Sequence, residues 1–481
     1  MTAHLTRARL TIIGFGLLAA LASLWLARAN LWPADTAALA GRAMLGMNGK
    51  ADLATLLAAY PPLPYVLLSI VEPFAALIGI AAPALLTAGL AGGFLVAYIV
   101  TMRRARFEVE AVVFLALLFC LHPFALFSVA SGPEAMLLLW GVWLYGLGLF
   151  GFRATGGVND LITLTLSLPL LAFTNLEGAV IAVSAVPFLL LSVPTQMLQR
   201  FYVSVYTVLL FPLLFSIFAF CIVSWILLHD PLAFVTPEFL QAARWSSQPW
   251  WLVAAACGAG VIGTMVIVPG MILRVSTRRP LQAAAGALLG TMMLAAALLA
   301  ILGLSSSAIG ALAPTVAAAA VVSARWPIER ARALRTAALM AIGLLIALSI
   351  TLTNIAAIRP ALDALFGSRI AGTTPEADLG EYLAGRDDVM IDAIAHPAVV
   401  TARGATRGLI TATDPAFTVA ILKRELDAPH VAVRQHQPGE SDDLVTRIFP
   451  ALYAQGAPGY RLTYDHQGWR VWSRTQSGDI Q

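Results

Sequence analysis

The sequence predicts an α-helical polytopic membrane protein with about eleven transmembrane helices and a small C-terminal α/β domain outside the membrane. Of the 481 residues, 59% are hydrophobic and 12% are charged, with a mean hydropathy of +0.82. Soluble domains have about 25% charged residues. Apolar runs of roughly 20 residues recur between Thr11 and Ala357, each long enough to cross a bilayer. These observations exclude a soluble enzyme, a nucleic-acid-binding protein and a disordered scaffold.

The membrane helices are predicted from the apolar runs and the arginines between them. They lie at about 10–28, 82–102, 109–129, 135–152, 161–174, 177–194, 202–228, 251–273, 281–303, 306–323 and 336–357. With a cytoplasmic N-terminus, the outer loops carry only Arg28, Arg42, Lys50 and Arg244 as basic residues, and the other loop arginines lie on the cytoplasmic side. This bias follows the positive-inside rule and places the C-terminal end outside.

One apolar run is predicted to lie on the outer face of the membrane. Residues 62–80 contain three prolines and Glu72, and counting them as a span would move the Arg103–Arg106 cluster outside. Residues 29–81 then form one long outer loop of a transmembrane domain over 1–357.

The C-terminal segment, residues 358–481, has the pattern of a separate α/β domain. Strands are predicted at Val389–Ile391, Val431–Val433, Tyr460–Tyr464 and Trp469–Trp472, with an amphipathic helix over Asp414–Leu426. Its histidines and acids match no catalytic or metal-binding motif, so we expect a solvated surface for His396, His430, His436, His466, Asp387, Asp388, Asp392, Asp442 and Asp443.

Two acids at predicted outer helix ends are candidate catalytic residues, since ionisable groups at membrane level are costly. Asp35 follows the first span and either caps a short helix over 36–46 or acts as a catalytic base. Glu134 opens the fourth span, where the helix dipole alone could explain it. If the two carboxylates meet, they could share a divalent metal ion; no other cofactor is indicated.

Three further outer residues could contact a substrate. Asn175 could hydrogen-bond a sugar, and Glu177 marks the same turn, where a structural role is the alternative. Arg244 precedes a tryptophan and could hold a phosphate or anchor at lipid headgroups. No P-loop or dinucleotide-binding motif is present, which disfavours ATP-driven pumps and nicotinamide enzymes.

Together these motifs resemble the C-type (GT-C) membrane glycosyltransferases. The resemblance rests on Asp35 after the first helix, the stretch Tyr60-Pro-Pro-Leu-Pro-Tyr, a span ending in Arg103-Arg104, and Glu134 opening the fourth helix. The family includes protein O-mannosyltransferases and the bacterial transferase that adds aminoarabinose to lipid A. The resemblance covers about residues 1–250.

By resemblance, Asp35 matches the family's first-loop acid, Tyr60–Pro62 its juxtamembrane motif, and Glu134 its second-loop acid, where Asp is commoner. Phe173-Thr-Asn-Leu-Glu-Gly resembles a Thr-Lys-Gly stretch but lacks its lysine, and Trp225–Trp245 resembles the loop between the seventh and eighth helices.

The resemblance implies an inverting glycosyltransferase of the bacterial inner membrane, active on the periplasmic side. Its donor would be a polyprenyl-phosphate sugar, and its acceptor lipid A, a polysaccharide or a protein. Asp35 would be the general base, and Arg244, Arg42 or a metal ion would stabilise the departing phosphate. The alternatives are a non-catalytic scaffold for polysaccharide assembly and a flippase for lipid-linked glycans.

Overall fold

The computed structural model describes residues 13–24, 32, 34–51, 61–104, 109–120, 128–129, 131–193, 195–232, 279–301, 374–435 and 443–475. Within these ranges the chain is mostly helical and contains a single five-stranded sheet. It divides into two compact units. Unit 1 comprises Met1–Leu31, Tyr60–Pro64 and Leu86–Arg369; unit 2 comprises Trp32–Ala59, Tyr65–Leu85 and Ile370–Gln481. The predicted boundary at residue 357 lies outside the described residues and stays a prediction.

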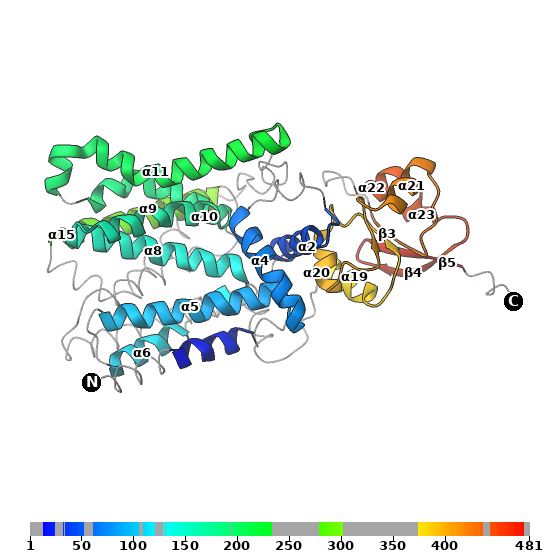
Figure 1. Ribbon diagram of the computed structural model, residues 1–481, viewed down its shortest axis with the longest axis horizontal. Helices are drawn as coiled ribbons and strands as arrows, with labels where there is room; N and C mark the ends of the chain where they lie inside the picture. Colours follow the sequence, from blue (N-terminus) through cyan, green and yellow to red (C-terminus); the bar gives the residue numbers. More distant parts are fainter. Residues whose placement is uncertain are drawn as a thin grey trace. The chain divides into compact units, whose positions relative to one another are not determined.

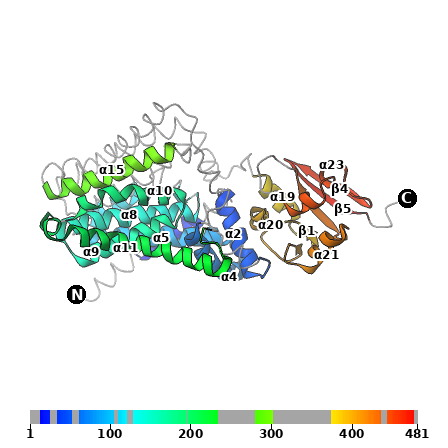
Figure 2. The same cartoon turned by 90° about the horizontal axis from the view of Figure 1, so that it is seen from above.

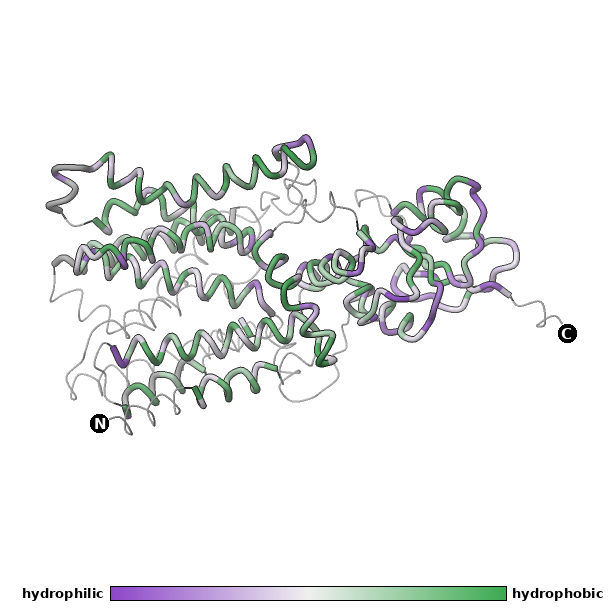
Figure 3. Tube along the Cα trace, in the orientation of Figure 1, coloured by the Kyte–Doolittle hydropathy of each residue, from purple (hydrophilic) through white to green (hydrophobic). Residues whose placement is uncertain are grey.

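Unit 1 is a bundle of apolar helices whose bounds follow the predicted spans (Figure 1). These helices are Ile13–Leu24, α5 (Ala82–Arg104, with its first turn in unit 2), α6 (Val109–Cys120), α8 (Pro133–Thr155), α9 (Val158–Ala172), α10 (Leu176–Ala185), the 3-10 segment η1 (Val186–Ser192), α11 (Thr195–Leu228) and α15 (Arg279–Ile301). Hydrophobic residues run along most of their length in Figure 3.

Three helices in the described part of the chain are long and apolar enough to cross a membrane: Ala82–Arg104, Pro133–Thr155 and Tyr202–Leu228. The predicted spans at 251–273, 306–323 and 336–357 lie outside the described residues. The number of eleven spans therefore stays a prediction, whereas long apolar helices are present as expected.

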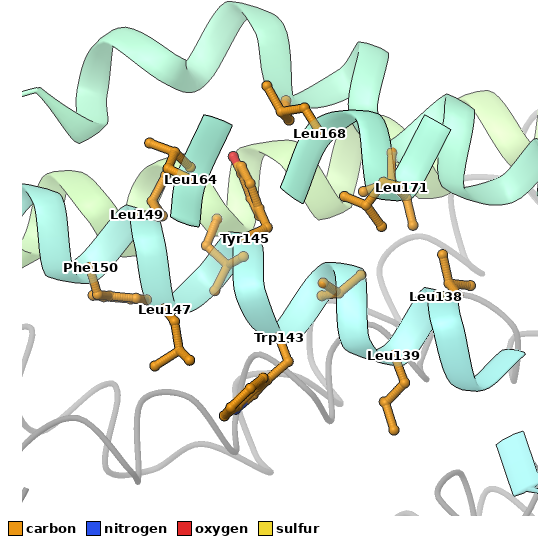
Figure 4. Close-up of a cluster of buried hydrophobic side chains, with 14 of the residues drawn as sticks. Leu138, Leu139, Trp143, Tyr145, Leu147, Leu149, Phe150, Leu164, Leu168 and Leu171 are labelled. Carbon is orange, nitrogen blue, oxygen red and sulfur yellow. The ribbon is translucent and has the colours of Figure 1, made fainter. Parts of the chain in front are cut away.

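Helices α8 and α9 pack through glycines on α8. A Cβ atom added at Gly148 would collide with the backbone of Leu164, and one at Gly141 would collide with the side chain of Leu171. Small residues let helix backbones approach closely, which is how helices associate where water supplies no driving force. Figure 4 shows Leu164, Leu168 and Leu171 of α9 facing the α8 side that carries Tyr145. The Tyr145 hydroxyl lies 3.0 Å from Thr291 Oγ1 of α15.

Helix α11 leaves a wide apolar surface uncovered in the described structure. Its exposed side chains include Phe211, Phe215, Phe218 and Trp225, each 57–63% accessible. A soluble monomer rarely exposes a contiguous apolar patch of this kind. Such a surface suits contact with lipid.

Unit 2 contains a five-stranded mixed sheet of order β2-β1-β3-β5-β4 (Figure 2). The strands are β1 (Val389–Met390), β2 (Leu409–Ile410), β3 (His430–Arg434), β4 (Tyr460–His466) and β5 (Trp469–Arg474). Strand β1 is parallel to β2 and β3, and β5 is antiparallel to β3 and β4. The β4–β5 turn has positive φ at both Gln467 and Gly468, as a tight type I′ hairpin requires. The four predicted strands are confirmed, and β2 is an additional one.

The sheet carries a hydrophobic core on each face, because successive side chains of a strand point to opposite sides. One core contains Val389, Ala432 and Trp469, and the other contains Met390 and Val431. The remaining helices of unit 2 are α2 (Ala34–Met47), α4 (Pro62–Ile78, whose first residues belong to unit 1), α19 (Pro375–Leu383), α20 (Pro397–Arg403), α21 (Pro415–Lys423), α22 (Leu444–Ile448) and α23 (Leu452–Gln455). The predicted helices at 62–80 and 414–426 thus correspond to α4 and α21.

Candidate active site

The candidate base Asp35 lies on helix α2, which belongs to unit 2. The helix begins at Ala34, so Asp35 is its second residue rather than the predicted N-cap, and its side chain is exposed. A carboxylate in the first turn is stabilised by the positive end of the helix dipole. Asp35 is therefore an accessible anion at a helix end.

Arg42 lies on the same face of α2 as Asp35. The two residues are seven positions apart, which is close to two helical turns and about 10 Å along the axis. Burial raises the pKa of the Tyr65 phenol in α4, and the positive charge of Arg42 opposes this rise. Arg42 is thus near the second tyrosine of the Tyr60–Tyr65 motif, and α2 presents a carboxylate and a cation on one face.

Three more candidate residues gather at one end of unit 1. Because α8 and α9 are antiparallel, the start of α8, the end of α9 and the start of α10 lie at the same end of the bundle. Glu134 is in the first turn of α8 and Glu177 in the first turn of α10. The two acids are both partly accessible. The two helix starts thus lie at the same end of the bundle, and the side of the membrane that this end faces stays a prediction.

Asn175 has a structural role in that turn. It is the N-cap of α10, and its Oδ1 accepts a hydrogen bond of 2.7 Å from the Gly178 backbone N–H. This bond satisfies one of the free donors at the helix start. The predicted contact between Asn175 and a sugar would be left to its amide nitrogen.

The proline-rich motif also reaches this end of unit 1. The backbone N–H of Leu63 donates to the carbonyl oxygen of Phe173, at 3.1 Å. Phe173 opens the turn that carries Asn175 and Glu177. Two motifs about 110 residues apart in the sequence are therefore joined by a backbone hydrogen bond.

The other predicted contacts are not brought together by the described structure. Tyr60 and Arg244 lie outside the described residues. Asp35 and Glu134 belong to different units, so the predicted shared metal site stays a prediction. Among the described residues, no group of three or more His, Cys, Asp or Glu side chains could hold a metal ion.

One expectation about the C-terminal segment is wrong. Asp392, His396 and Asp443 were expected on a solvated surface, but they are only 4–7% accessible. Asp392 Oδ2 accepts from Leu444 N at 2.9 Å, and Asp443 Oδ1 accepts from Val445 N, also at 2.9 Å. The carboxylates are buried because they bind backbone N–H groups that would otherwise be unsatisfied.

Burial changes the acidity of two of these groups. It raises the pKa of Asp443 to about 6, with the nearby Asp392 adding to the rise, while hydrogen bonds from Val445 and Thr446 oppose it. Burial also lowers the pKa of His396 to about 3, and the charge of Arg434 adds to that effect. The His396 ring packs edge-on against Trp469, with centroids 4.7 Å apart, and its Nε2 has no hydrogen-bond partner. No sequence motif signals this burial.

A cavity of about 910 Å³ lies in unit 2, and none of the described candidate catalytic or substrate-binding residues lines it. Its lining includes the apolar side chains of Met390, Phe449 and Tyr460, with Lys423 and Arg474 among the charged residues. Arg474 and Asp427, which form an ion pair at 2.7 Å, both line it.

We compared the sequence with models of known families and with curated proteins. The chain matches no family model and no curated protein.

Proposed function

We propose that the protein is a glycosyltransferase that moves a sugar from a polyprenyl-phosphate donor to an acceptor hydroxyl of the cell envelope. The reaction would take place at the periplasmic face of the bacterial inner membrane, and the acceptor would be lipid A, a polysaccharide or a protein. One observation carries the proposal: α2, directly after the first apolar helix, has an exposed carboxylate and a cation on one face, at Asp35 and Arg42.

The two groups suit the two charge changes of sugar transfer. The acceptor O–H gives its proton to the Asp35 carboxylate as its oxygen attacks the anomeric carbon. The bond between that carbon and the phosphate oxygen breaks, and polyprenyl phosphate leaves with the electron pair. Arg42 would stabilise the negative charge on the departing phosphate, together with Arg244 in the proposed site. Attack opposite the leaving group inverts the anomeric centre.

The helix starts at one end of unit 1 supply further support. Glu134 and Glu177 begin helices there, and the Leu63–Phe173 hydrogen bond holds the proline-rich motif beside the Asn175 turn. We assign Glu134 a role in positioning the acceptor, or with Asp35 in holding a divalent metal ion, and Asn175, Glu177 and Tyr60 contacts to the sugar. Each assignment is part of the proposal.

The test is complementation of a deletion strain, with envelope glycans and lipid A analysed by mass spectrometry. Wild type should restore one sugar mass that the deletion loses, and its value identifies the sugar. Asp35→Asn should lower the restored amount by roughly 10²- to 10⁴-fold, as expected for loss of a general base. Glu134→Gln should also lower it.

Asp160→Asn is the matched control. Asp160 is likewise an acid in the first turn of a helix, at the opposite end of α9 from Phe173. Immunoblots must show equal protein levels. Full restoration by Asp35→Asn would reject the general-base assignment and favour the non-catalytic scaffold, whereas a lipid-linked glycan that accumulates on the cytoplasmic face of the deletion strain would favour the flippase.

A further inference from the structure

Helix α2 is part of the hydrophobic core of unit 2, although it lies more than 320 residues before the sheet. Leu45 is fully buried in the same core as Val389 of β1 and Leu409 of β2. Thr36, Leu39, Ala40 and Ala43 are 1–3% accessible and follow the i, i+3, i+4, i+7 spacing of one helix face. Gly41 and Leu45, on the other side of the helix, are buried as well, whereas Asp35 in the first turn is exposed and Arg42 is partly accessible.

The contact between α2 and α20 is close enough to involve the backbone (Figures 1 and 2). A Cβ atom added at Gly41 would collide with the carbonyl oxygen of Pro397, so only glycine fits there. One helical turn earlier, the Ala37 carbonyl accepts a hydrogen bond of 2.6 Å from Thr401 Oγ1. These two contacts oppose both sliding of α2 along its axis and rotation about that axis. The Ala37 contact is only two residues from Asp35.

An ion pair holds the C-terminal end of α2. Gly49 has a φ of +66°, and the Lys50 backbone N–H donates to the Leu45 carbonyl at 2.8 Å, an end that turns the chain back on itself. Lys50 Nζ then lies 2.5 Å from Asp414 Oδ1 and 3.2 Å from the Leu409 carbonyl at β2.

Asp414 is also held by hydrogen bonds within its own segment. Its other oxygen, Oδ2, accepts hydrogen bonds from the Thr411 backbone N–H and hydroxyl, at 2.7 and 3.1 Å. Together with Lys50 these bonds hold the pKa of Asp414 below its usual value, against the effect of burial. The Thr411 hydrogen bonds thus orient the carboxylate that Lys50 contacts.

We propose that the C-terminal segment of unit 2 (residues 374–475) positions Asp35 for sugar transfer by holding α2, with Lys50, Asp414, Thr401 and Gly41 as positioning residues. The inference rests on the proposed function and deepens it, because it makes the C-terminal segment part of the catalytic apparatus. A displacement of a reacting group by about 1 Å can cost roughly 100-fold in rate. Loosening α2 should therefore lower transfer while Asp35 itself is intact.

The experiment measures transfer and the α2–α20 contact separately. Lys50→Glu, Asp414→Lys and the double charge swap are expressed in the deletion strain, and the transferred sugar is measured by mass spectrometry. The contact is measured as the protection of the α2 backbone amides from hydrogen exchange in the full chain in detergent, which leaves Thr401 and Gly41 unchanged. Lys423→Glu is the matched control, because Lys423 is exposed on α21 and is the chain's other lysine.

Each single charge reversal should lower transfer at least tenfold and reduce the protection of α2 from hydrogen exchange at least twofold, and the charge swap should restore both. Gly41→Leu should abolish both, and the charge-swap rescue distinguishes this role from a general folding defect. Normal transfer in Lys50→Glu with reduced protection of α2 would overturn the positioning role alone. Identical glycans in wild type and deletion would reject the proposed function as well, and the positioning role with it.

Discussion

The two units differ in the polar groups that they bury. In the described part of unit 1, the buried polar residues other than tyrosine and tryptophan are all serines and threonines. Many of them return their hydroxyl to a carbonyl of their own helix, as Ser167 does to Leu164 and Thr291 to Ala287. Unit 2 buries Asp392, His396, Arg403 and Asp443. An apolar surrounding without water tolerates hydroxyls that bond locally, whereas charges need dedicated partners.

Unit 2 supplies those partners from its own loops for Asp392, Arg403 and Asp443. His396 is instead kept neutral by its lowered pKa, and its Nε2 has no hydrogen-bond partner. Arg403 donates to the carbonyls of Arg386, Ala405 and Arg407 at 2.6–2.7 Å. Its guanidinium thus binds the ends of the chain segments that flank β1 and β2. The comparison shows that unit 1 is held by close helix packing and unit 2 by a polar network as well as a core.

The largest effect is expected from exchanging a packed glycine for leucine in either unit. Gly41→Leu should push α2 from α20 and cost about 3 kcal/mol or more, since neither backbone can give way. Hydrogen exchange of the full chain in detergent should then show that residues 374–475 lose protection, whereas α8 and α9 keep theirs. Gly148→Leu should do the reverse, because the added side chain meets Leu164.

Gly89→Leu is the control for this pair, because a Cβ atom at Gly89 meets nothing within 4 Å. It should leave protection unchanged in both units. Loss of protection across the whole chain in Gly41→Leu would contradict the division into two separately packed units.

The sequence predicts what is local and misses what is distant. The α8–α9 pair follows from two adjacent apolar runs, and β4–β5 from two alternating segments with a tight turn. The packing of α2 on α20 joins Ala37 to Thr401, 364 residues apart, and nothing in either segment indicates the other. Strands β1 and β2 both have two residues, and only β1 is predicted, from the longer apolar run Val389–Ile391.

The candidate site divides along the same line. The accessibility of Asp35 and the position of Glu134 and Glu177 at helix starts follow from apolar boundaries in the sequence. The hydrogen bond from Leu63 to Phe173 and the burial of His396 depend on tertiary packing, which no residue pattern reports. The roles of Tyr60 and Arg244 stay predictions.

The second prediction concerns Asp443, which should make the stability of unit 2, but not that of unit 1, depend on pH. Its folded pKa of about 6 lies above the ordinary value of 3.8. The folded state therefore holds its proton longer than the unfolded state, and stability is lost as pH rises from about 4 to about 6. This difference in pKa lowers the free energy of unfolding at pH 7 by at most ~3 kcal/mol. Asp443→Asn should remove this loss, because the amide oxygen can still accept from Val445.

The measurement is hydrogen exchange of residues 430–434 and 469–474 in the full chain between pH 4 and 7, corrected for the intrinsic exchange rate. Asp443→Asn should protect these strands more than wild type at pH 7 and equally at pH 4. Peptides of α8 and α9 should be the same in both proteins. Weaker protection in the variant at pH 7 would mean that the carboxylate is held charged by its partners.

The smallest effect, and the one with the opposite slope, belongs to His396. Its folded pKa of about 3 lies below the ordinary 6.5, so the unfolded state binds a proton first as pH falls. The contribution of His396 to the free energy of unfolding is fully present above about pH 6.5. It declines towards pH 3, with a loss of ~2 kcal/mol at pH 5. His396→Phe keeps the edge-on contact with Trp469 and cannot take a proton, so β3 and β5 should lose less protection at pH 5 in this variant than in wild type.

Because Asp443 and His396 act in opposite directions between pH 4 and 6, the double variant should have a flatter profile of protection against pH than either single variant. Among the described residues of unit 1, no Asp, Glu, His, Lys or Arg is in the buried class, so the α8 and α9 peptides should already have a flat profile between pH 4 and 7 in wild type.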